Sequence, residues 1–283
     1  MGSTGSGVWL SGSVRGWTSA FVLIRLGHNG VFRPAMKKIL LTGMNGTLAP
    51  VLAEELRKRG DEVVAWDRGA VSPDDRGAVE HFIRDVKPSA LIHCAMGSPQ
   101  WAEDMARVSA EEGSKFLYVS SASVYGTHQY GPFIVDDVPQ PSDDYGRYKL
   151  ECEQRVRAAN ADARIVRIGW QIALRRGGNQ MTEYLAQRQV EHGHIAASTE
   201  WFPACSFLED TARVLAGVVD DAVAGLYLLD GNPGWNFWDI ATALNSAMGR
   251  HWEVRRSCDF KWDNRLVDKG LPAIPLTRAL RRL

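Results

Sequence analysis

Three polar side chains in the middle of the chain have the types needed for proton transfer at a carbonyl oxygen. Tyr145 and Lys149 lie four residues apart, and Ser121 ends the apolar segment 115–121. Residues four apart share one face of a helix, so the tyrosine and the lysine can reach one ligand. A tyrosine has an ordinary pKa of about 10, and we expect a neighbouring ammonium to lower it towards the range of a working general acid. The serine hydroxyl can stabilise negative charge that builds on the reacting oxygen.

These three residues are the predicted catalytic set. Ser120 is interpreted as a strand-end cap and Tyr125 as a packing aromatic. No side chain can carry a hydride, so redox chemistry at this site requires a nicotinamide cofactor. A tyrosine and a lysine at this spacing also arise by chance. The order along the chain supports the set, because Ser121 ends a predicted strand and Tyr145 begins a predicted helix.

Apolar strands and amphipathic helices alternate from residue 38 onwards and would position this set. The predicted strands are "ILLTG", "EVVAWD", "ALIHCA", "KFLYVSS" and "ARIVRIG". The predicted helices are "APVLAEELRKRG", "DRGAVEHFIRDVK", "QWAEDMARVSAEEG" and "DYGRYKLECEQRVRAAN". This alternation predicts an α/β fold, a Rossmann-like doubly wound parallel sheet with helices on both faces.

The chain divides into three expected regions. Residues 1–35 are rich in Gly and Ser without useful periodicity, and we expect a disordered leader or an extension there. Residues 36–170 are the predicted dinucleotide-binding domain. In residues 171–283 the alternation loosens between loops that carry Trp and Pro, which predicts a smaller substrate-binding lobe interleaved with the end of the sheet.

A glycine turn follows the first predicted strand. Gly43, Gly46 and Ala49 are spaced as G-x-x-G-x-x-A, a tightened form of the dinucleotide fingerprint in which the turn brings phosphate to a helix amino end. Asp67 ends the second predicted strand, where a carboxylate can bind the adenosine ribose. The predicted cofactor-binding residues at this turn and strand end are Gly43, Asn45, Gly46, Thr47, Leu48, Asp67 and Arg68.

The composition sets limits on partners and compartment. The 33 basic and 33 acidic residues give no net charge, which argues against nucleic acid and anionic membranes as partners. The longest apolar run near the start, "AFVLI", is far shorter than the roughly 20 residues that a spanning helix needs. Four scattered cysteines without companion histidines predict no metal site and are interpreted as buried thiols of a reducing compartment. We therefore expect a cytoplasmic protein.

The motifs together resemble the extended short-chain dehydrogenase/reductases, most closely the dTDP-4-dehydrorhamnose reductase-like branch of the NAD-dependent epimerase/dehydratase group. The matching segments are "TGMNGTLA", Asp67, "IHCA", "VSSASVYG", "YGRYK" and "VRIGW". The resemblance implies that Tyr145 donates the proton, that Lys149 binds the nicotinamide ribose and that Ser121 holds the substrate carbonyl. It also implies that His93, Cys94 and Ala95 of "IHCA" lie against the cofactor, so that with Tyr145 and Lys149 they complete the predicted cofactor-binding set. The segment "DNRLVDKGLP" is implied to help cover a nucleotide sugar.

The chain departs from this family in the connector 96–114, which is short and lacks the asparagine that usually helps to organise the lysine. The expected function is NAD(P)-dependent reduction of a keto group on a nucleotide-activated deoxysugar. Two alternatives stay open: an epimerase that retains NAD, and a dinucleotide-binding regulatory subunit without turnover. Dehydration is disfavoured, because Ala122 and Ser123 replace the acid pair that dehydratases carry beside the hydroxyl residue.

The choice of cofactor and the contacts to the nucleotide are weaker predictions. NAD is favoured over NADP, because the charge of Asp67 would repel a 2′-phosphate, while Arg68 would admit some NADP. Trp201, Arg255, Arg256 and Arg265 are candidates for contact with a nucleoside diphosphate through stacking and charge. The base, the sugar and the oligomeric state are left open by the sequence, a homodimer included.

Overall fold

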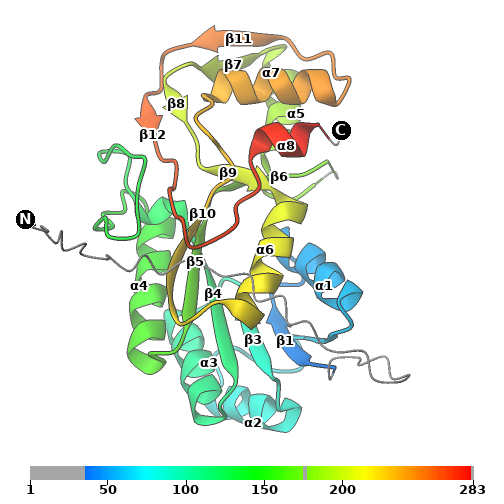
Figure 1. Ribbon diagram of the computed structural model, residues 1–283, viewed down its shortest axis with the longest axis vertical. Coiled ribbons are helices and arrows are strands. Elements are labelled where there is room, and N and C mark those ends of the chain that lie inside the picture. The colour runs from blue at the N-terminus through cyan, green and yellow to red at the C-terminus, as the bar shows by residue number, and fades with distance from the viewer. Residues whose placement is uncertain (1–35, 175–176, 282–283) are drawn as a thin grey trace, which may run out of the picture. The chain divides into compact units, whose positions relative to one another are not determined.

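The computed structural model describes residues 36–174 and 177–281 (Figure 1), so the expectation for residues 1–35 lies outside the described residues. The first part of the described chain alternates strands and helices as the sequence predicts. In chain order its elements are β1 Lys38–Thr42, α1 Leu48–Lys58, β2 Glu62–Ala65, α2 Arg76–Val86, β3 Ala90–His93, α3 Pro99–Glu111, β4 Lys115–Ser121, the 3-10 turn η1 Ala122–Val124, α4 Asp144–Ala159 and β5 Arg164–Ile168.

The central sheet has six parallel strands in the order β10-β5-β4-β3-β1-β2. The predicted Rossmann-like α/β fold is therefore confirmed. The edge strand β10 (Gly225–Leu229) comes from the region after residue 170 and pairs in parallel with β5. Because all six strands run the same way, their carboxyl ends meet at one edge of the sheet, which is where ligands bind in open α/β folds.

Helices cover both faces of the sheet, because side chains on each strand alternate between two buried clusters. Ile39 and Leu41 of β1 pack on the face covered by α1 and α6 (Leu208–Asp221), and Leu40 packs on the face of α2, α3 and α4. Figure 1 shows α1 and α6 on one side of the sheet and α4 on the other. Strands buried on both faces explain the nearly continuous apolar runs in the sequence.

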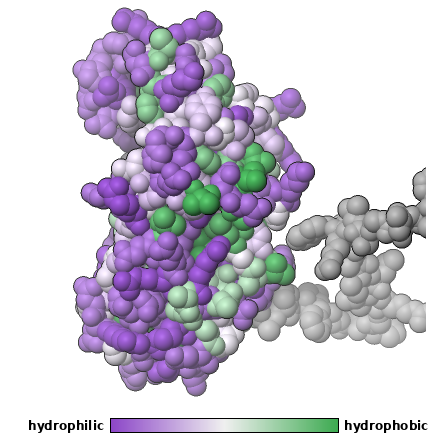
Figure 2. Space-filling model, turned by 90° about the vertical axis from the view of Figure 1, so that its left-hand side faces the viewer, coloured by the Kyte–Doolittle hydropathy of each residue, from purple (hydrophilic) through white to green (hydrophobic). Residues whose placement is uncertain are grey.

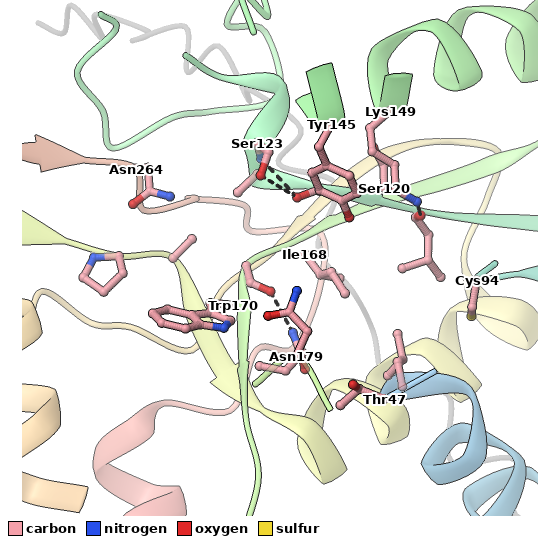
Figure 3. A pocket seen from close by; sticks show the side chains of 18 of the residues that line it. Thr47, Cys94, Ser120, Ser123, Tyr145, Lys149, Ile168, Trp170, Asn179 and Asn264 are labelled. Atoms are coloured by element: carbon pink, nitrogen blue, oxygen red, sulfur yellow. Dashed lines mark hydrogen bonds between the residues drawn. The ribbon is translucent and has the colours of Figure 1, made fainter. Parts of the chain in front are cut away.

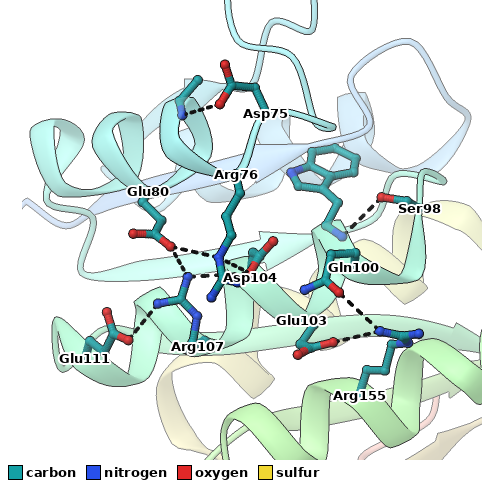
Figure 4. Close-up of polar contacts among 12 residues, drawn as sticks. Asp75, Arg76, Glu80, Ser98, Gln100, Glu103, Asp104, Arg107, Glu111 and Arg155 are labelled. Atoms are coloured by element: carbon teal, nitrogen blue, oxygen red, sulfur yellow. Dashed lines mark hydrogen bonds and ion pairs between the residues drawn. The ribbon is translucent and has the colours of Figure 1, made fainter.

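Ion pairs join the three helices of the second face to one another (Figure 4). Between α2 and α3, Arg76 Nε lies 3.2 Å from Asp104 Oδ1, and Arg107 pairs with Glu80. Between α3 and α4, Arg155 Nη1 donates to Glu103 Oε2 at 2.9 Å. Asp104 is buried, so its pairing satisfies a carboxylate at the edge of the apolar cluster, whereas the other two pairs lie nearer the surface and each add little to stability.

The remaining elements build a smaller lobe beyond the carboxyl edge of the sheet (Figure 1). They are β6 Trp170–Ile172, α5 Met181–His192, β7 Ile195–Ser198, β8 Trp201–Phe202, β9 Cys205–Phe207, α7 Phe237–Ala247, β11 Val254–Ser257, β12 Trp262–Asp263 and α8 Leu276–Leu280. The short strands pair in parallel as β6-β9, β7-β11 and β8-β12. Sequence reasoning missed these strands, because two to four residues cannot show an alternating pattern.

The C-terminal segment 262–276, called the strap below, fastens this lobe to the sheet domain. Its backbone carbonyls at Asp263 and Arg265 accept hydrogen bonds from Gly131 N at 2.7 Å and Phe133 N at 2.8 Å, in the loop between η1 and α4. Asp268 Oδ2 accepts from Leu228 N of β10 at 2.9 Å. These hydrogen bonds hold the strap, the loop and the sheet edge together. Figure 2 shows apolar side chains gathered across the middle of the face on the left of Figure 1.

One buried ion pair lies behind the carboxyl end of β4. Arg167 of β5 donates to Glu153 of α4 through Nε at 2.9 Å and Nη2 at 2.7 Å, and each residue is 3% exposed. Arg167 Nη1 also donates to the Tyr125 hydroxyl at 2.7 Å, and Ser120 Oγ donates to Glu153 Oε1. Every charge in the cluster is paired, as burial requires.

No helix in residues 36–174 or 177–281 is both long and apolar enough to cross a bilayer.

Removing one partner of this pair should destabilise the fold strongly. We expect Arg167→Met to lower the free energy of unfolding by about 3–5 kcal/mol, because it leaves the Glu153 carboxylate buried without its cation. Arg155→Met is the matched control, since its guanidinium pairs with Glu103 at the surface, and we expect a much smaller loss. Urea unfolding of both variants measures the difference. Equal losses would contradict a buried charge cluster at Arg167.

Candidate active site

A cavity of about 410 Å³ opens at the carboxyl edge of the sheet, between the glycine turn, the ends of β4 and β5, and the smaller lobe. The predicted catalytic residues Ser121, Tyr145 and Lys149 all line it. In Figure 3, Thr47 and Cys94 lie at one end of the cavity and Asn264 at the other, with Tyr145 between them. The structure thus brings together the trio that the sequence places in separate elements.

Ser121 and Tyr145 are joined by a hydrogen bond between their hydroxyls. Ser121 Oγ also accepts from Ser123 N at 3.1 Å and lies 3.1 Å from Ser123 Oγ. Helix α4 begins beside this cluster, and its amino end is capped by Asp143, whose Oδ1 accepts from Gly146 N at 2.6 Å. The cap fixes where α4 begins and therefore where Tyr145 stands in its first turn, so the phenol points towards the end of β4.

A close backbone approach sets the position of α4. A Cβ atom added to Gly146 would collide with the carbonyl oxygen of Ser123 and come within 2.9 Å of Pro141 Cβ. Only glycine lets the first turn of the helix touch the η1 backbone. Its place next to Tyr145 therefore follows from the geometry of the site.

Lys149 is almost fully buried below the cavity. Its Nζ donates to the Val119 carbonyl at 3.0 Å and lies 4.9 Å from the centroid of the Tyr118 ring. Burial lowers the pKa of Lys149 from its ordinary value, and the neighbouring Cys152, Cys94 and Glu153 oppose that shift. The Val119 carbonyl thus holds the ammonium in a chain whose connector 96–114 has no asparagine.

The pKa of Tyr145 moves in the direction opposite to the expectation from sequence. Burial of its hydroxyl end raises the pKa above the ordinary value, although 42% of the residue is exposed, and the hydrogen bond with Ser121 opposes the rise. Desolvation of the phenolate outweighs any effect of the Lys149 ammonium, which lies 5.9 Å from the ring centroid. Tyr145 therefore carries its proton at neutral pH and has the form of a proton donor.

The glycine turn forms the other end of the cavity. Gly43 has φ +90°, and a Cβ there would lie 3.1 Å from Ala95 N, so both its conformation and its contact require glycine. Gly46 N donates to Gly43 O at 2.8 Å and closes the turn. Helix α1 then starts at Leu48, and Thr47 makes no side-chain capping bond to its first N–H groups. Those N–H groups are available to an anion.

The predicted cofactor residues fall into three groups. Gly43, Gly46, Thr47, Leu48, Cys94, Tyr145 and Lys149 line the cavity. Asn45 is exposed at the turn, and Asp67 and Arg68 are exposed after β2. His93 and Ala95 are buried and do not line the cavity.

His93 belongs to the apolar core. Its Nδ1 lies 3.0 Å from Thr42 Oγ1, its ring packs edge-on against Trp101, and burial lowers its pKa to about 3. The histidine is therefore neutral, and its side chain is a packing group between β1 and β3. The alternation along β3 already turns its side chain away from Cys94, which faces the cavity.

Several cavity residues come from segments without a recognisable motif. Trp170, Gln171, Asn179, Trp201, Trp262 and Asn264 also line the cavity. The sequence singled out Trp201, and the resemblance pointed to "DNRLVDKGLP", which contains Asn264, but neither singled out Asn264 itself or gave a signal for Asn179. Only contacts between distant segments bring these residues to the cavity.

The arginines considered for nucleotide contact are engaged elsewhere. Arg255 pairs with Glu253 at 2.7 Å, and the Arg256 guanidinium lies 4.2 Å from the centroid of the Trp238 ring. Arg265 pairs with Asp263 at 2.6 Å. None of the three lines the cavity. In residues 36–174 and 177–281, no three His, Cys, Asp or Glu side chains gather as metal ligands.

The sheet order and the glycine turn at its carboxyl edge define a Rossmann-like α/β protein. Residues 36–98 and 99–258 match the RmlD substrate binding domain, and the chain belongs to this family. This result agrees with the resemblance to dTDP-4-dehydrorhamnose reductases seen in the sequence.

Two kinds of relative are similar in sequence. The chain is 27% identical over 242 residues to a dTDP-4-dehydrorhamnose reductase of Mycolicibacterium smegmatis, covering 78% of this chain and 72% of that protein. It is 25% identical over 244 residues to methionine adenosyltransferase 2 subunit beta of Xenopus laevis, covering 75% of this chain and 72% of that protein. One relative is named as an enzyme and the other as a subunit.

Solved structures share the fold. A dTDP-4-dehydrorhamnose reductase from Bacillus anthracis in complex with NADP superposes with a TM-score of 0.75 at 18% identity, covering 87% of this chain and 98% of that one. The Bordetella bronchiseptica enzyme WbmH in complex with NAD+ gives a TM-score of 0.68 at 22% identity, covering 82% and 89%.

The four cysteines allow a test of the cavity wall. All are free thiols, but only Cys152 and Cys205 are buried, whereas Cys94 is half-buried and Cys258 is exposed, which corrects the expectation that all four are buried. Burial raises the pKa of Cys94 to about 12, so at pH 8 only about one molecule in ten thousand carries the reactive thiolate. We expect iodoacetamide to label Cys258 rapidly and Cys94 at least about 100-fold more slowly. Peptide mass spectrometry measures both rates, and equal rates would show that Cys94 is an activated thiol.

Proposed function

We propose that this protein reduces a keto group on a nucleotide-activated deoxysugar with NADPH or NADH. The observation that carries the proposal is the convergence of Ser121, Tyr145 and Lys149 on one cavity that also contains the uncapped amino end of α1. Membership of the RmlD substrate binding domain family and the reductase among the relatives support it.

The residues at the glycine turn fit a dinucleotide. The first N–H groups of α1 suit a pyrophosphate, and the turn at Gly43 and Gly46 leaves room for backbone to approach it. Lys149 and Tyr145 lie between this end and the far end, where a nicotinamide ribose and a carbonyl would meet. When bound, the nicotinamide supplies the hydride that no side chain can carry.

The side chains of the site perform the proton half of the reduction. Tyr145, neutral because its pKa is raised, donates its hydroxyl proton to the carbonyl oxygen as that oxygen gains charge. Ser121, held by Ser123, supplies a second hydroxyl at the same oxygen. The Lys149 ammonium then favours the phenolate left on Tyr145, which regains its proton from water. The products are the alcohol and the oxidised cofactor.

Two residues after β2 favour different dinucleotides. Asp67 repels a 2′-phosphate, and its Oδ1 already accepts from Gly69 N at 2.8 Å. Arg68 donates to the Met96 carbonyl and lies 5.1 Å from the centroid of the Trp101 ring. The arginine is thus ordered beforehand and would lose little side-chain freedom on pairing with a 2′-phosphate, which favours NADPH. The charge of Asp67 favours NADH, so the proposed preference for NADH is modest.

A second candidate function is that of a dinucleotide-binding subunit without turnover. The relative named as a subunit of methionine adenosyltransferase supports it. The complete trio favours the reductase instead, because a subunit that performs no chemistry has no need of Tyr145. An epimerase that retains NAD uses the same trio, and mass spectrometry of the purified protein would detect its retained cofactor.

Removing the phenol should abolish turnover without preventing cofactor binding. We expect Tyr145→Phe to lower the rate of dTDP-4-dehydrorhamnose reduction by about 100-fold or more, with dinucleotide affinity within a few-fold of wild type. Ser121→Ala should be milder. Tyr148→Phe is the matched control, since its hydroxyl accepts from Gly97 N at 3.0 Å and does not line the cavity. General acid catalysis by Tyr145 is the wrong account if its Phe variant keeps more than about a tenth of the activity.

The cofactor preference can be measured by binding alone. We expect Asp67→Ala to raise the affinity for NADP+ relative to NAD+, because it removes the repulsive carboxylate. Arg68→Ala should lower the affinity for NADP+ relative to NAD+. Calorimetric dissociation constants for both dinucleotides on the three proteins give the answer. A wild type that binds NADP+ more than about tenfold tighter than NAD+, or about 1.4 kcal/mol, would show that Arg68 governs the pocket.

A further inference from the structure

Asn264 occupies the end of the cavity opposite the glycine turn (Figure 3) and is 9% exposed. It follows β12 in the strap, where its backbone N–H donates to the Phe202 carbonyl of the β8 segment at 3.1 Å. The neighbouring strap carbonyl of Asp263 accepts from Gly131 N at 2.7 Å. Backbone pairing on both sides therefore fixes the Asn264 side chain at the cavity wall.

One hydrogen bond determines which end of the Asn264 amide faces the cavity. Trp201 Nε1 is a donor only, and it lies 3.2 Å from Asn264 Oδ1. The oxygen is thereby assigned to the indole, and Nδ2 is directed into the cavity (Figure 3). No hydrogen bond from Nδ2 is found in the described structure. Nδ2 keeps accessible surface in the cavity, so a ligand that binds there can accept its hydrogen bond.

Aromatic side chains line the same wall of the cavity. Trp170 and Trp201 have ring centroids 6.1 Å apart and planes inclined by 25°. Gln171 also lines the cavity, but its Nε2 donates to the Gly169 carbonyl at 2.9 Å and its Oε1 is buried away from the cavity space. The far end thus offers the Asn264 donor and an apolar aromatic wall.

The described residues at the far end of the cavity carry no charge. Among the described residues that line the whole cavity there is no Asp, Glu or Arg, and the basic side chain is Lys149, which lies nearer the middle. Recognition at this end therefore depends on neutral hydrogen bonds and on apolar contact.

We propose that Asn264 is a specificity-determining residue that binds the sugar ring of the substrate. Its Nδ2 donates to a sugar oxygen, and Trp201 both orients the amide and contacts the apolar side of the ring. The assignment rests on the proposed function and adds to it the group that distinguishes the sugar from the nucleotide.

The test compares two ligands that differ only by the sugar. Calorimetry on protein saturated with NADP+ gives dissociation constants for dTDP-rhamnose, the reduction product, and for dTDP alone. Asn264→Asp keeps the oxygen that accepts from Trp201 but replaces the inward donor by an acceptor. We expect Asn264→Asp to weaken the binding of dTDP-rhamnose by about tenfold or more and to change the binding of dTDP by less than about twofold. Trp201→Phe keeps a ring but loses the orienting N–H, so its affinity for dTDP-rhamnose should lie between those of wild type and Asn264→Asp.

Asn264→Ser serves as a second variant that retains a small donor, and melting temperatures verify folding. The inference is overturned if Asn264→Asp and Asn264→Ser bind dTDP-rhamnose as tightly as wild type, if both ligands weaken equally, or if wild type gains nothing from the sugar. Turnover is measured separately with dTDP-4-dehydrorhamnose. Sugar binding that depends on Asn264 in a wild type without turnover would reject the reductase and leave this assignment standing.

Discussion

The packing of α4 against the end of β4 is the constraint on which the rest of the site depends. One stripe of the helix makes three contacts: Gly146 meets the Ser123 backbone, Lys149 donates to the Val119 carbonyl, and Glu153 accepts from Ser120. These contacts hold the helix at a fixed height above the sheet. Tyr145 reaches the Ser121 hydroxyl only because this height is fixed.

The electrostatics of the site follow from the same packing. Lys149 is a buried cation, and its desolvation is compensated by a carbonyl, an aromatic ring and the nearby carboxylate of Glu153. That carboxylate is itself held by Arg167, so the charges form a chain from β5 to the cavity. Burial also raises the pKa of Tyr145, which keeps the phenol protonated. A buried lysine and a neutral tyrosine suit the reduction of a carbonyl better than its reverse at neutral pH.

The sequence predicts the sheet domain well, because each strand and helix there has its own periodicity and the glycine turn has a steric requirement. It also singles out Ser121, Tyr145 and Lys149, which the structure brings to one cavity. The resemblance points to the segment that contains Asn264, but the sequence cannot single out this residue, because the strap and the short strands are held by contacts between distant segments. His93 shows the converse case, because a residue within a motif has its side chain turned into the core by strand alternation.

The pH dependence of hydride transfer tests most directly whether Tyr145 is the proton donor. Single-turnover oxidation of NADPH by dTDP-4-dehydrorhamnose should proceed at a constant rate through neutral pH. The rate should fall only above the ordinary tyrosine pKa of about 10, because the proton is lost as pH rises through a raised pKa. The residual rate of Tyr145→Phe should lack this fall. A wild-type rate that increases with pH through the neutral range would show that the phenolate is the active form and would contradict the account.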